Sequence, residues 1–334
     1  MAKNKTNIQW TEITWNPTIG CSLMSPGCTN CYAMKFAHRL ASFGGPVGRR
    51  YSGLTEVAAN GEPVWTGVVK LVEEALLQPL SWRGRKRVFV NSMSDLFHPD
   101  LPFTAVARIW AVMALAARHT FQVLTKRPDR MRDWLNDPAT PAAVEAEMRK
   151  IRPGARLAAW PLRNAWVGTS VEDQKRADER IPILADTKAA VRFLSIEPLL
   201  GPVYLKAAAT PSVLRRLHWV IVGGESGPRA RPMHPAWARS LRDECAQSGI
   251  AFFFKQFGTW GFPVSGKTRK TIGLMPGGRE VPVGTPGSTA LARLGKKLAG
   301  ERLDGQLHQA FPTAPQPTPP QGSLPFAKPA KRAA

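Results

Sequence analysis

The sequence predicts an α/β fold, built as a partial or near-complete barrel of parallel strands. The first observation is a repeat: between residues 88 and 258, short apolar, β-branched or aromatic runs end in polar clusters, and a helix-like stretch usually follows. Continuous apolar runs favour strands that are buried on both faces, as in parallel sheets. The second observation is the spacing of the runs, which is close to the length of a βαβ unit. The runs lie at residues 87–95, 121–128, 165–172, 191–198, 218–226 and 251–258.

A further strand is predicted at the start of the chain, over residues 13–21 (ITWNPTIGC), and it ends at a cysteine-rich loop. The total of about seven strands favours a barrel over a doubly wound open sheet. In either fold the carboxyl ends of the strands meet at one edge, where functional side chains gather. Residues 32–87 form a long insertion between the first and second strands.

Three helices are predicted from the segments between the runs. Residues 103–118 are alanine-rich and apolar enough to pack on a sheet, whereas residues 171–190 carry the charge expected on the outer face of a crossover helix. Residues 235–248 begin with Pro235, which suits the first turn, and are followed by Gly249, which favours a helix end.

The domain organisation follows from where the repeat stops. Residues 1–260 are predicted to form the barrel, and residues 261–312 a basic C-terminal extension with one basic helix between 287 and 310. Residues 313–334 are rich in Pro, Ala and Lys, so they cannot bury a core and are predicted to be a disordered basic tail.

The charge indicates a polyanionic partner. The chain has 46 Lys and Arg against 24 Asp and Glu, a net charge of +22, and nucleic acid is the partner that such an excess favours. The plainer interpretation is that the basic residues only solvate the surface. No apolar run reaches the roughly 18 residues that cross a bilayer, and the N-terminus lacks a signal-like stretch, so we expect no membrane contact and a cytoplasmic location. The absence of a Walker A string argues against an NTPase.

Three of the four cysteines, Cys21, Cys28 and Cys31, fall in one short stretch with the spacing C-x6-C-x2-C. This spacing has three interpretations. The thiolates could hold a [4Fe–4S] cluster that leaves one iron open, or a zinc ion together with a histidine such as His38, or they could be structural thiols. Cys245 lies in a helical pattern and is interpreted as a buried thiol.

The chain also resembles a radical-SAM-like family of bacteriophage and prophage proteins with no assigned function. The resemblance covers most of residues 8–260, in strings that occur in the same order. The first cysteine gap is longer than the C-x3-C-x2-C usual in radical S-adenosylmethionine enzymes, and the aromatic residue, Tyr32, follows the last cysteine instead of preceding it. The strings are IQWTEITWNPTIGC, PGCTNCYA, VFVNSMSDLFH, FQVLTKRP, WVGTSVE, FLSIEPLLGP, WVIVGGESGPRARPMHPAW and FFFKQFGTW.

The resemblance implies an enzyme of the radical S-adenosylmethionine type. Cys21, Cys28 and Cys31 would bind three irons of a [4Fe–4S] cluster, and S-adenosylmethionine would bind the fourth. An electron donor would then trigger release of a 5′-deoxyadenosyl radical. With the basic charge, this predicts a nucleic acid or nucleotide-derived substrate. The alternative is a non-catalytic, zinc-stabilised nucleic-acid-binding protein.

Polar residues at the predicted strand ends are the candidates for binding the cofactor. Each has a plainer interpretation as well: Ser and Asp often cap helices or turns, a loop lysine can be solvated, and Glu197 could pair internally with Lys126 or Lys255. The candidates are Ser92, Asp95, Lys126, Ser170, Glu172 and Glu197.

Three residues from the last two strand ends, Glu225, Arg229 and Lys255, are the candidates for substrate contact. Glu225 follows two glycines, which allow a close approach of the backbone to a ligand or a tight turn.

Overall fold

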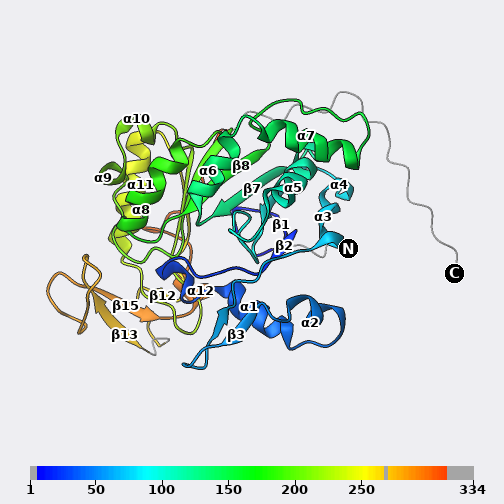
Figure 1. Cartoon of the computed structure of the whole chain (residues 1–334). Coiled ribbons are helices and arrows are strands. Elements are labelled where there is room, and N and C mark those ends of the chain that lie inside the picture. Colours follow the sequence, from blue (N-terminus) through cyan, green and yellow to red (C-terminus); the bar gives the residue numbers. More distant parts are fainter. Residues whose placement is uncertain (1–5, 267–269, 314–334) are drawn as a thin grey trace.

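Seven parallel strands form the centre of the protein in the computed structural model, which describes residues 6–266 and 270–313 (Figure 1). Each strand pairs in parallel with its neighbours, in the order β1-β6-β7-β8-β9-β10-β11. The sheet is curled into a half-barrel whose edges are β1 and β11, so the partial form of the predicted barrel is the one observed. The strands are β1 (Ile13–Trp15), β6 (Arg87–Val90), β7 (Thr120–Thr125), β8 (Ala165–Ser170), β9 (Val191–Ile196), β10 (Trp219–Gly223) and β11 (Ala251–Gln256).

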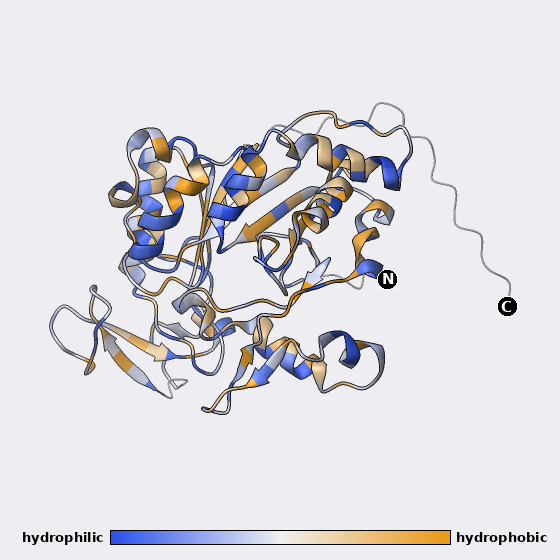
Figure 2. Ribbon diagram, viewed as in Figure 1, coloured by the Kyte–Doolittle hydropathy of each residue, from blue (hydrophilic) through white to orange (hydrophobic). Residues whose placement is uncertain are grey.

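Helices in the connections cover one face of this sheet, along the upper side of Figure 1. Alternate strand residues such as Val88, Val90 and Val123 pack against them in the main hydrophobic core. Figure 2 shows the hydrophobic colour along β7 and the hydrophilic colour on the peripheral helix α2 (Gly45–Tyr51). The covering helices are α5 (Phe103–Leu115), α6 (Pro128–Asn136), α7 (Thr140–Ile151), α8 (Gln174–Ala185), α9 (Leu205–Ala208), α10 (Pro211–Leu214) and α11 (Pro235–Ser248).

The helices predicted from sequence are present. Helix α11 has the predicted bounds because Pro235 starts its first turn and Gly249, with φ of 67°, ends it in the left-handed conformation. The predictions over 103–118 and 171–190 correspond to the shorter helices α5 and α8.

Aromatic side chains fill the opposite face of the sheet towards the amino ends of the strands. Trp219 is fully buried at their centre, in a cluster that also takes in residues from both ends of the described chain. Because apolar rings occupy this level, polar side chains on the same face gather at the carboxyl ends of the strands. The ring centroids 5.0–6.2 Å from that of Trp219 belong to Trp10, Trp166, Phe193, Phe253 and Phe311.

The predicted insertion between the first two central strands consists of short elements, of which α1, α2 and β3 lie below the sheet in Figure 1 and α3 and α4 lie at the right beside α5. Strands β2 and β5 pair with each other, as do β3 and β4. Besides α2, the elements are β2 (Thr18–Ile19), a 3₁₀ turn (Pro26–Cys28), α1 (Tyr32–Ala41), β3 (Thr55–Val57), β4 (Pro63–Trp65), β5 (Lys70–Leu71), α3 (Glu73–Leu76) and α4 (Gln78–Ser81).

The C-terminal extension is mainly a four-stranded antiparallel sheet of β12 (Trp260–Gly261), β15 (Thr289–Arg293), β13 (Thr271–Leu274) and β14 (Glu280–Val281). The basic helix predicted between 287 and 310 is present only as a single turn. Its first part is strand β15, and only α12 (Lys296–Ala299) is helical. Gly295 and Gly300, with φ of 81° and 80°, stop this helix on both sides because a right-handed helix requires negative φ.

Two further predictions concern the C-terminal tail and the membrane. The predicted disordered tail, residues 313–334, lies outside the described residues apart from Thr313. In the described part of the chain, none of the helices combines the length and the apolar character needed to span a membrane.

Candidate functional site

The three clustered cysteines lie in one segment, residues 21–31, which we call the cysteine loop. It leaves the sheet at the carboxyl edge, where Gly20 forms a parallel bridge with Ser94 in the segment after β6. The loop contains a 3₁₀ turn that ends at Cys28, and Cys31 directly precedes α1. The loop therefore begins and ends beside the strand ends at which the sequence predicted functional residues.

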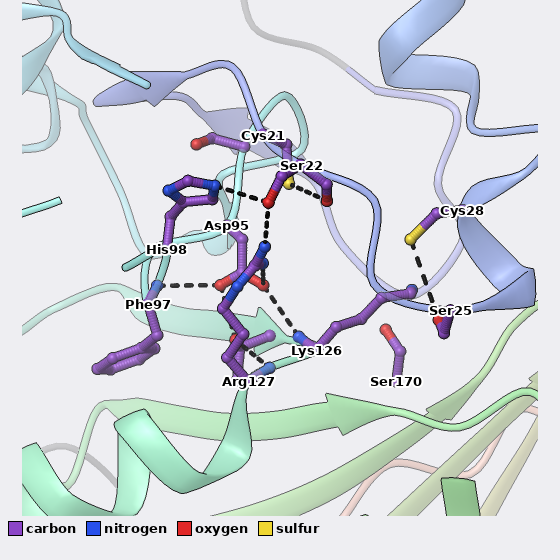
Figure 3. Close-up of polar contacts among 12 residues, drawn as sticks. Cys21, Ser22, Ser25, Cys28, Asp95, Phe97, His98, Lys126, Arg127 and Ser170 are labelled. Atoms are coloured by element: carbon purple, nitrogen blue, oxygen red, sulfur yellow. Dashed lines mark hydrogen bonds and ion pairs between the residues drawn. The ribbon is translucent and has the colours of Figure 1, made fainter. Parts of the chain in front are cut away.

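The first contact that holds the loop is a buried ion pair (Figure 3). Asp95 and Arg127 are about 5% and 4% exposed, and Arg127 Nη1 lies 2.9 Å from Asp95 Oδ2. The second guanidinium nitrogen, Nη2, donates to Ser22 Oγ at 2.7 Å, and that hydroxyl also lies 2.8 Å from His98 Nε2. Asp95 accepts three more hydrogen bonds, from the Thr125 hydroxyl and from two backbone amides. Arg127 and His98 therefore fix Ser22, the residue that follows Cys21, and the other hydrogen bonds hold Asp95 in place.

The second contact comes from the end of β8. Glu172 is 1% exposed and accepts a hydrogen bond from the Gly27 backbone amide, with an N–Oε1 distance of 3.3 Å. Its other oxygen pairs with Arg180 of α8 at 3.3 Å, and Arg180 also donates to the Ser170 carbonyl. A side chain at position 27 would meet the Glu172 carboxyl group at 3.2 Å, so glycine suits this close approach.

The third contact comes from the end of β10. Glu225 is 7% exposed and accepts hydrogen bonds from the Asn30 side-chain amide at 3.0 Å and from the backbone and guanidinium of Arg231. Arg231 also donates to the Pro26 carbonyl at 3.0 Å. These charge-assisted hydrogen bonds hold the pKa of Glu225 below its ordinary value despite its burial.

The three contacts have the same arrangement of residues. Each joins a buried carboxylate–arginine pair at a strand end to a residue next to a cysteine: Ser22 follows Cys21, Gly27 precedes Cys28, and Asn30 precedes Cys31. A buried carboxylate is stable only when it is paired and hydrogen-bonded, so each contact is demanding in its geometry. The positions of the three cysteines are therefore set by the sheet and not by the loop alone.

The thiols themselves are free and close enough to influence one another. Burial raises the pKa of the Cys21 thiol to about 12, with further contributions from Asp95 and Cys31. Burial also raises the pKa of Cys31, and Cys28 adds to this effect. A thiol with a raised pKa stays protonated at neutral pH, so binding a metal here would require release of protons.

The placement of possible metal ligands near the cysteines is the next feature. Among residues 6–266 and 270–313, no group of three His, Cys, Asp or Glu side chains is arranged to hold a metal ion. His38, the histidine considered as a zinc ligand, lies 3.2 Å through Nδ1 from the Thr55 hydroxyl.

The remaining cofactor candidates lie at the same edge. The Ser92 hydroxyl donates to Asn16 at 3.1 Å, and its carbonyl accepts from the Tyr32 hydroxyl at 2.8 Å. The Lys126 backbone amide donates to Asp95, while its ammonium group offsets part of the rise that burial causes in the pKa of Cys31. Ser170 is buried at the end of β8 (Figure 3).

Glu197 and Lys255 form an ion pair, which confirms the internal pairing with Lys255 considered from the sequence. Gly223 lies on the strand between them, and a side chain there would approach both within 3.5 Å. Glu197 Oε1 is buried without a hydrogen-bond partner among the described residues, so it can still accept a hydrogen bond. Burial and Lys255 lower the pKa of Lys296, which places a second lysine near this pair.

The side chains of Glu225 and Arg229, two of the three substrate candidates, have different ionic partners, although the Asn30 amide donates to the Glu225 carboxylate and to the Arg229 carbonyl. Glu225 pairs with Arg231, whereas Arg229 is largely exposed and pairs with Glu62 of the insertion at 2.8 Å. Ser22, Gly27 and Asn30, which receive the three contacts, were not predicted as site residues; their signal in the sequence is their position next to cysteines.

Comparison with known proteins places this architecture in one family. The sequence profile of DUF5131, described as a protein of unknown function, matches residues 5–312, and the chain belongs to this family. No curated protein and no solved structure gave a significant match.

Proposed function

We propose that this DUF5131 protein is a radical S-adenosylmethionine-type enzyme in which Cys21, Cys28 and Cys31 hold a [4Fe–4S] cluster. The observation that carries the proposal is the cysteine loop, in which the residues next to the three cysteines are held by three buried carboxylate–arginine pairs at the carboxyl ends of a parallel half-barrel. Catalytic and cofactor groups of α/β barrels gather at this edge.

The chemistry of the donors fits such a cluster. Three cysteines supply soft thiolate ligands, and a cluster of several atoms keeps its ligands farther apart than a single ion does. That wider spacing is compatible with the absence of a single-ion group among the described side chains. When bound with S-adenosylmethionine, the cluster would supply the electron that releases a 5′-deoxyadenosyl radical.

The chain's own residues would bind and orient the cosubstrate. Lys126, whose charge acts on Cys31, offers a cation for a carboxylate. Glu197 Oε1, which has an open acceptor position, offers a hydrogen bond to a ribose hydroxyl. Lys255 keeps Glu197 ionised and in place. Asp95 and Glu172 act through the loop because their oxygens are already engaged with arginines.

The substrate class rests on charge. A net charge of +22 supports a nucleic acid or nucleotide-derived substrate, and the proposed chemistry also needs an electron-donor partner.

Anaerobic reconstitution with iron and sulfide tests the proposal. We expect about four irons per chain, loss of iron in Cys21→Ala, Cys28→Ala and Cys31→Ala, and full iron in Cys245→Ala, because Cys245 is buried in α11 away from the loop. The loaded protein should form 5′-deoxyadenosine from S-adenosylmethionine under dithionite, and Glu197→Gln should slow this by about tenfold or more through loss of cosubstrate affinity. One tightly held zinc per chain with no cleavage would instead support the zinc-stabilised nucleic-acid-binding protein.

A further inference from the structure

The basic residues are unevenly distributed between the two edges of the central sheet. The amino edge is the edge where the parallel strands begin, opposite the cysteine loop. The segments that lead into five neighbouring strands, β6 to β10, contain ten Lys or Arg residues and one acidic residue, Asp186. These segments are residues 82–87, 116–120, 163–164, 186–192 and 209–218.

The carboxyl edge has no such excess. The segments that follow the same five strands contain five Lys or Arg residues and six acidic residues. Most of the acids there are paired with arginines or lysines around the cysteine loop, as described above. The positive charge of the sheet is therefore concentrated at the amino edge. These segments are residues 91–98, 126–130, 171–173, 197–200 and 224–231.

Four exposed arginines of the amino edge are available to an external partner. Arg83, Arg163, Arg215 and Arg216 are exposed, and none forms an ion pair with a carboxylate within the described chain. Burial, followed by the charge of Arg216, lowers the pKa of Arg192, so cations of neighbouring segments lie close enough to repel each other. A polyanion would relieve this repulsion.

Cations of neighbouring segments also lie close together before β6 and β7. His119 is fully buried at the start of β7, and burial together with the charges of Arg118 and Lys86 lowers its pKa to about 4. The segments before β6 and β7 therefore contribute to one positive region, as those before β9 and β10 do.

The shape of this region matches a nucleic-acid backbone. Neighbouring strands lie about 4.8 Å apart, so the starts of five strands form a row of roughly 19 Å. A duplex carries one negative charge per roughly 1.7 Å of its axis, so several phosphates face a row of this length. Such contacts add affinity without reading base sequence.

The leading segments, which lie among the described residues, have no large exposed apolar side chains, and this limits the class of partner. None of the large apolar residues exposed among the described residues belongs to the five leading segments. Single-stranded nucleic acid is usually held by stacking on exposed aromatic rings, and membrane surfaces by inserted apolar side chains. A row of cations without either feature favours the phosphates of a duplex.

We propose that the amino edge binds the phosphodiester backbone of duplex nucleic acid without sequence specificity. The proposal does not depend on what the cysteines bind. The central strands are at most six residues long, which separates the two edges by roughly 20 Å. A duplex held at the amino edge therefore leaves the cysteine loop free for a separate substrate.

The test uses the full chain and fluorescence anisotropy with labelled duplexes of DNA and RNA. The edge variant combines Arg83→Gln, Arg163→Gln, Arg215→Gln and Arg216→Gln. The control variant removes the same charge from exposed residues elsewhere, with Arg49→Gln, Lys175→Gln, Lys206→Gln and Lys297→Gln. Thermal unfolding of both variants establishes that they are folded.

We expect the edge variant to bind duplex at least about tenfold more weakly at moderate salt, and the slope of log K against log salt to fall by about 3 to 4. The control should retain most of the affinity and slope of the wild type. Equal loss in the two variants would overturn the proposal, as would the absence of duplex binding by the wild type. Binding of single strands or of phosphatidylserine vesicles as tight as that of duplex would overturn it too.

Discussion

Replacing Arg127 with methionine should destabilise the protein and release the start of the cysteine loop. The substitution leaves the buried carboxylate of Asp95 without its cation and removes the hydrogen bond to Ser22. Breaking a buried ion pair by deleting one partner costs about 3–5 kcal/mol. Asp95 keeps three other donors, from Phe97, Thr125 and Lys126, so we expect a loss near the lower end, about 3 kcal/mol.

Urea unfolding of Arg127→Met, Asp95→Asn and the double variant measures this effect. Because the neutral amide no longer needs a cation, the double variant should be more stable than Arg127→Met alone, with a coupling of about 1–3 kcal/mol. The pKa of His98, which burial and Arg127 lower, should rise in Arg127→Met when followed by NMR. A loss below about 1 kcal/mol, or strictly additive variants, would refute this account of the ion pair.

Three further predictions concern other parts of the structure. Glu172→Gln should lower the free energy of unfolding by about 3 kcal/mol, because Arg180 loses its buried counter-charge and the single amide oxygen cannot accept from both Arg180 and Gly27; a urea midpoint like that of the wild type would contradict this. Gly20→Ala should cost more than about 2 kcal/mol, since φ is 91° and a Cβ would lie 2.1 Å from a carbonyl oxygen; Gly53→Ala, with φ of 75° and open space, is the control and should cost about 1 kcal/mol in the same urea assay. The pKa of His119 is about 4 in the folded protein and 6.5 ordinarily, so the folded state binds fewer protons and stability should fall by up to about 3 kcal/mol as pH falls from 6.5 to 4. His119→Gln should remove that part of the pH dependence, and an unchanged pH profile would exclude His119 as its source.

The fold was largely predictable where local signals and burial agree. Helix α11 was predicted to the residue because Pro235 and Gly249 mark its ends by backbone geometry alone. The central strands were predictable because burial on both faces leaves long apolar runs. The prediction of a basic helix between 287 and 310 held only for α12, although the composition of the segment favours a helix. Pairing with β12 and β13 makes the first part a strand, and the glycines around α12 limit the helix to a single turn.

The candidate site was predictable in position but not in pairing. The strand-end rule pointed to Asp95, Glu172 and Glu225, and the structure places all three at the carboxyl edge. Their contacts with the loop span more than a hundred residues of sequence: 145 between Gly27 and Glu172, and 195 between Asn30 and Glu225. Such pairs are set by the closure of the sheet, so no local pattern reveals them.

The net charge of +22 does not say where on the protein the positive charge lies. The direction of the strands indicates this location. In an all-parallel sheet every strand begins at the same edge, so a bias toward Lys and Arg in the leading segments adds up to one surface. In an antiparallel sheet the same bias would be divided between both edges and largely lost.

The location of the cations, and not the total charge, should govern duplex binding. A variant that keeps the four edge substitutions can be returned to a net charge of +22 by neutralising four exposed acids elsewhere. These are Glu56→Gln, Asp129→Asn, Glu179→Gln and Glu280→Gln. We expect this variant to bind duplex as weakly as the edge variant, because counterion release depends on cations in contact with phosphates. If restoring the net charge restored the affinity in anisotropy titrations, the basic surface would act as a diffuse field, and the assignment to the amino edge would be wrong.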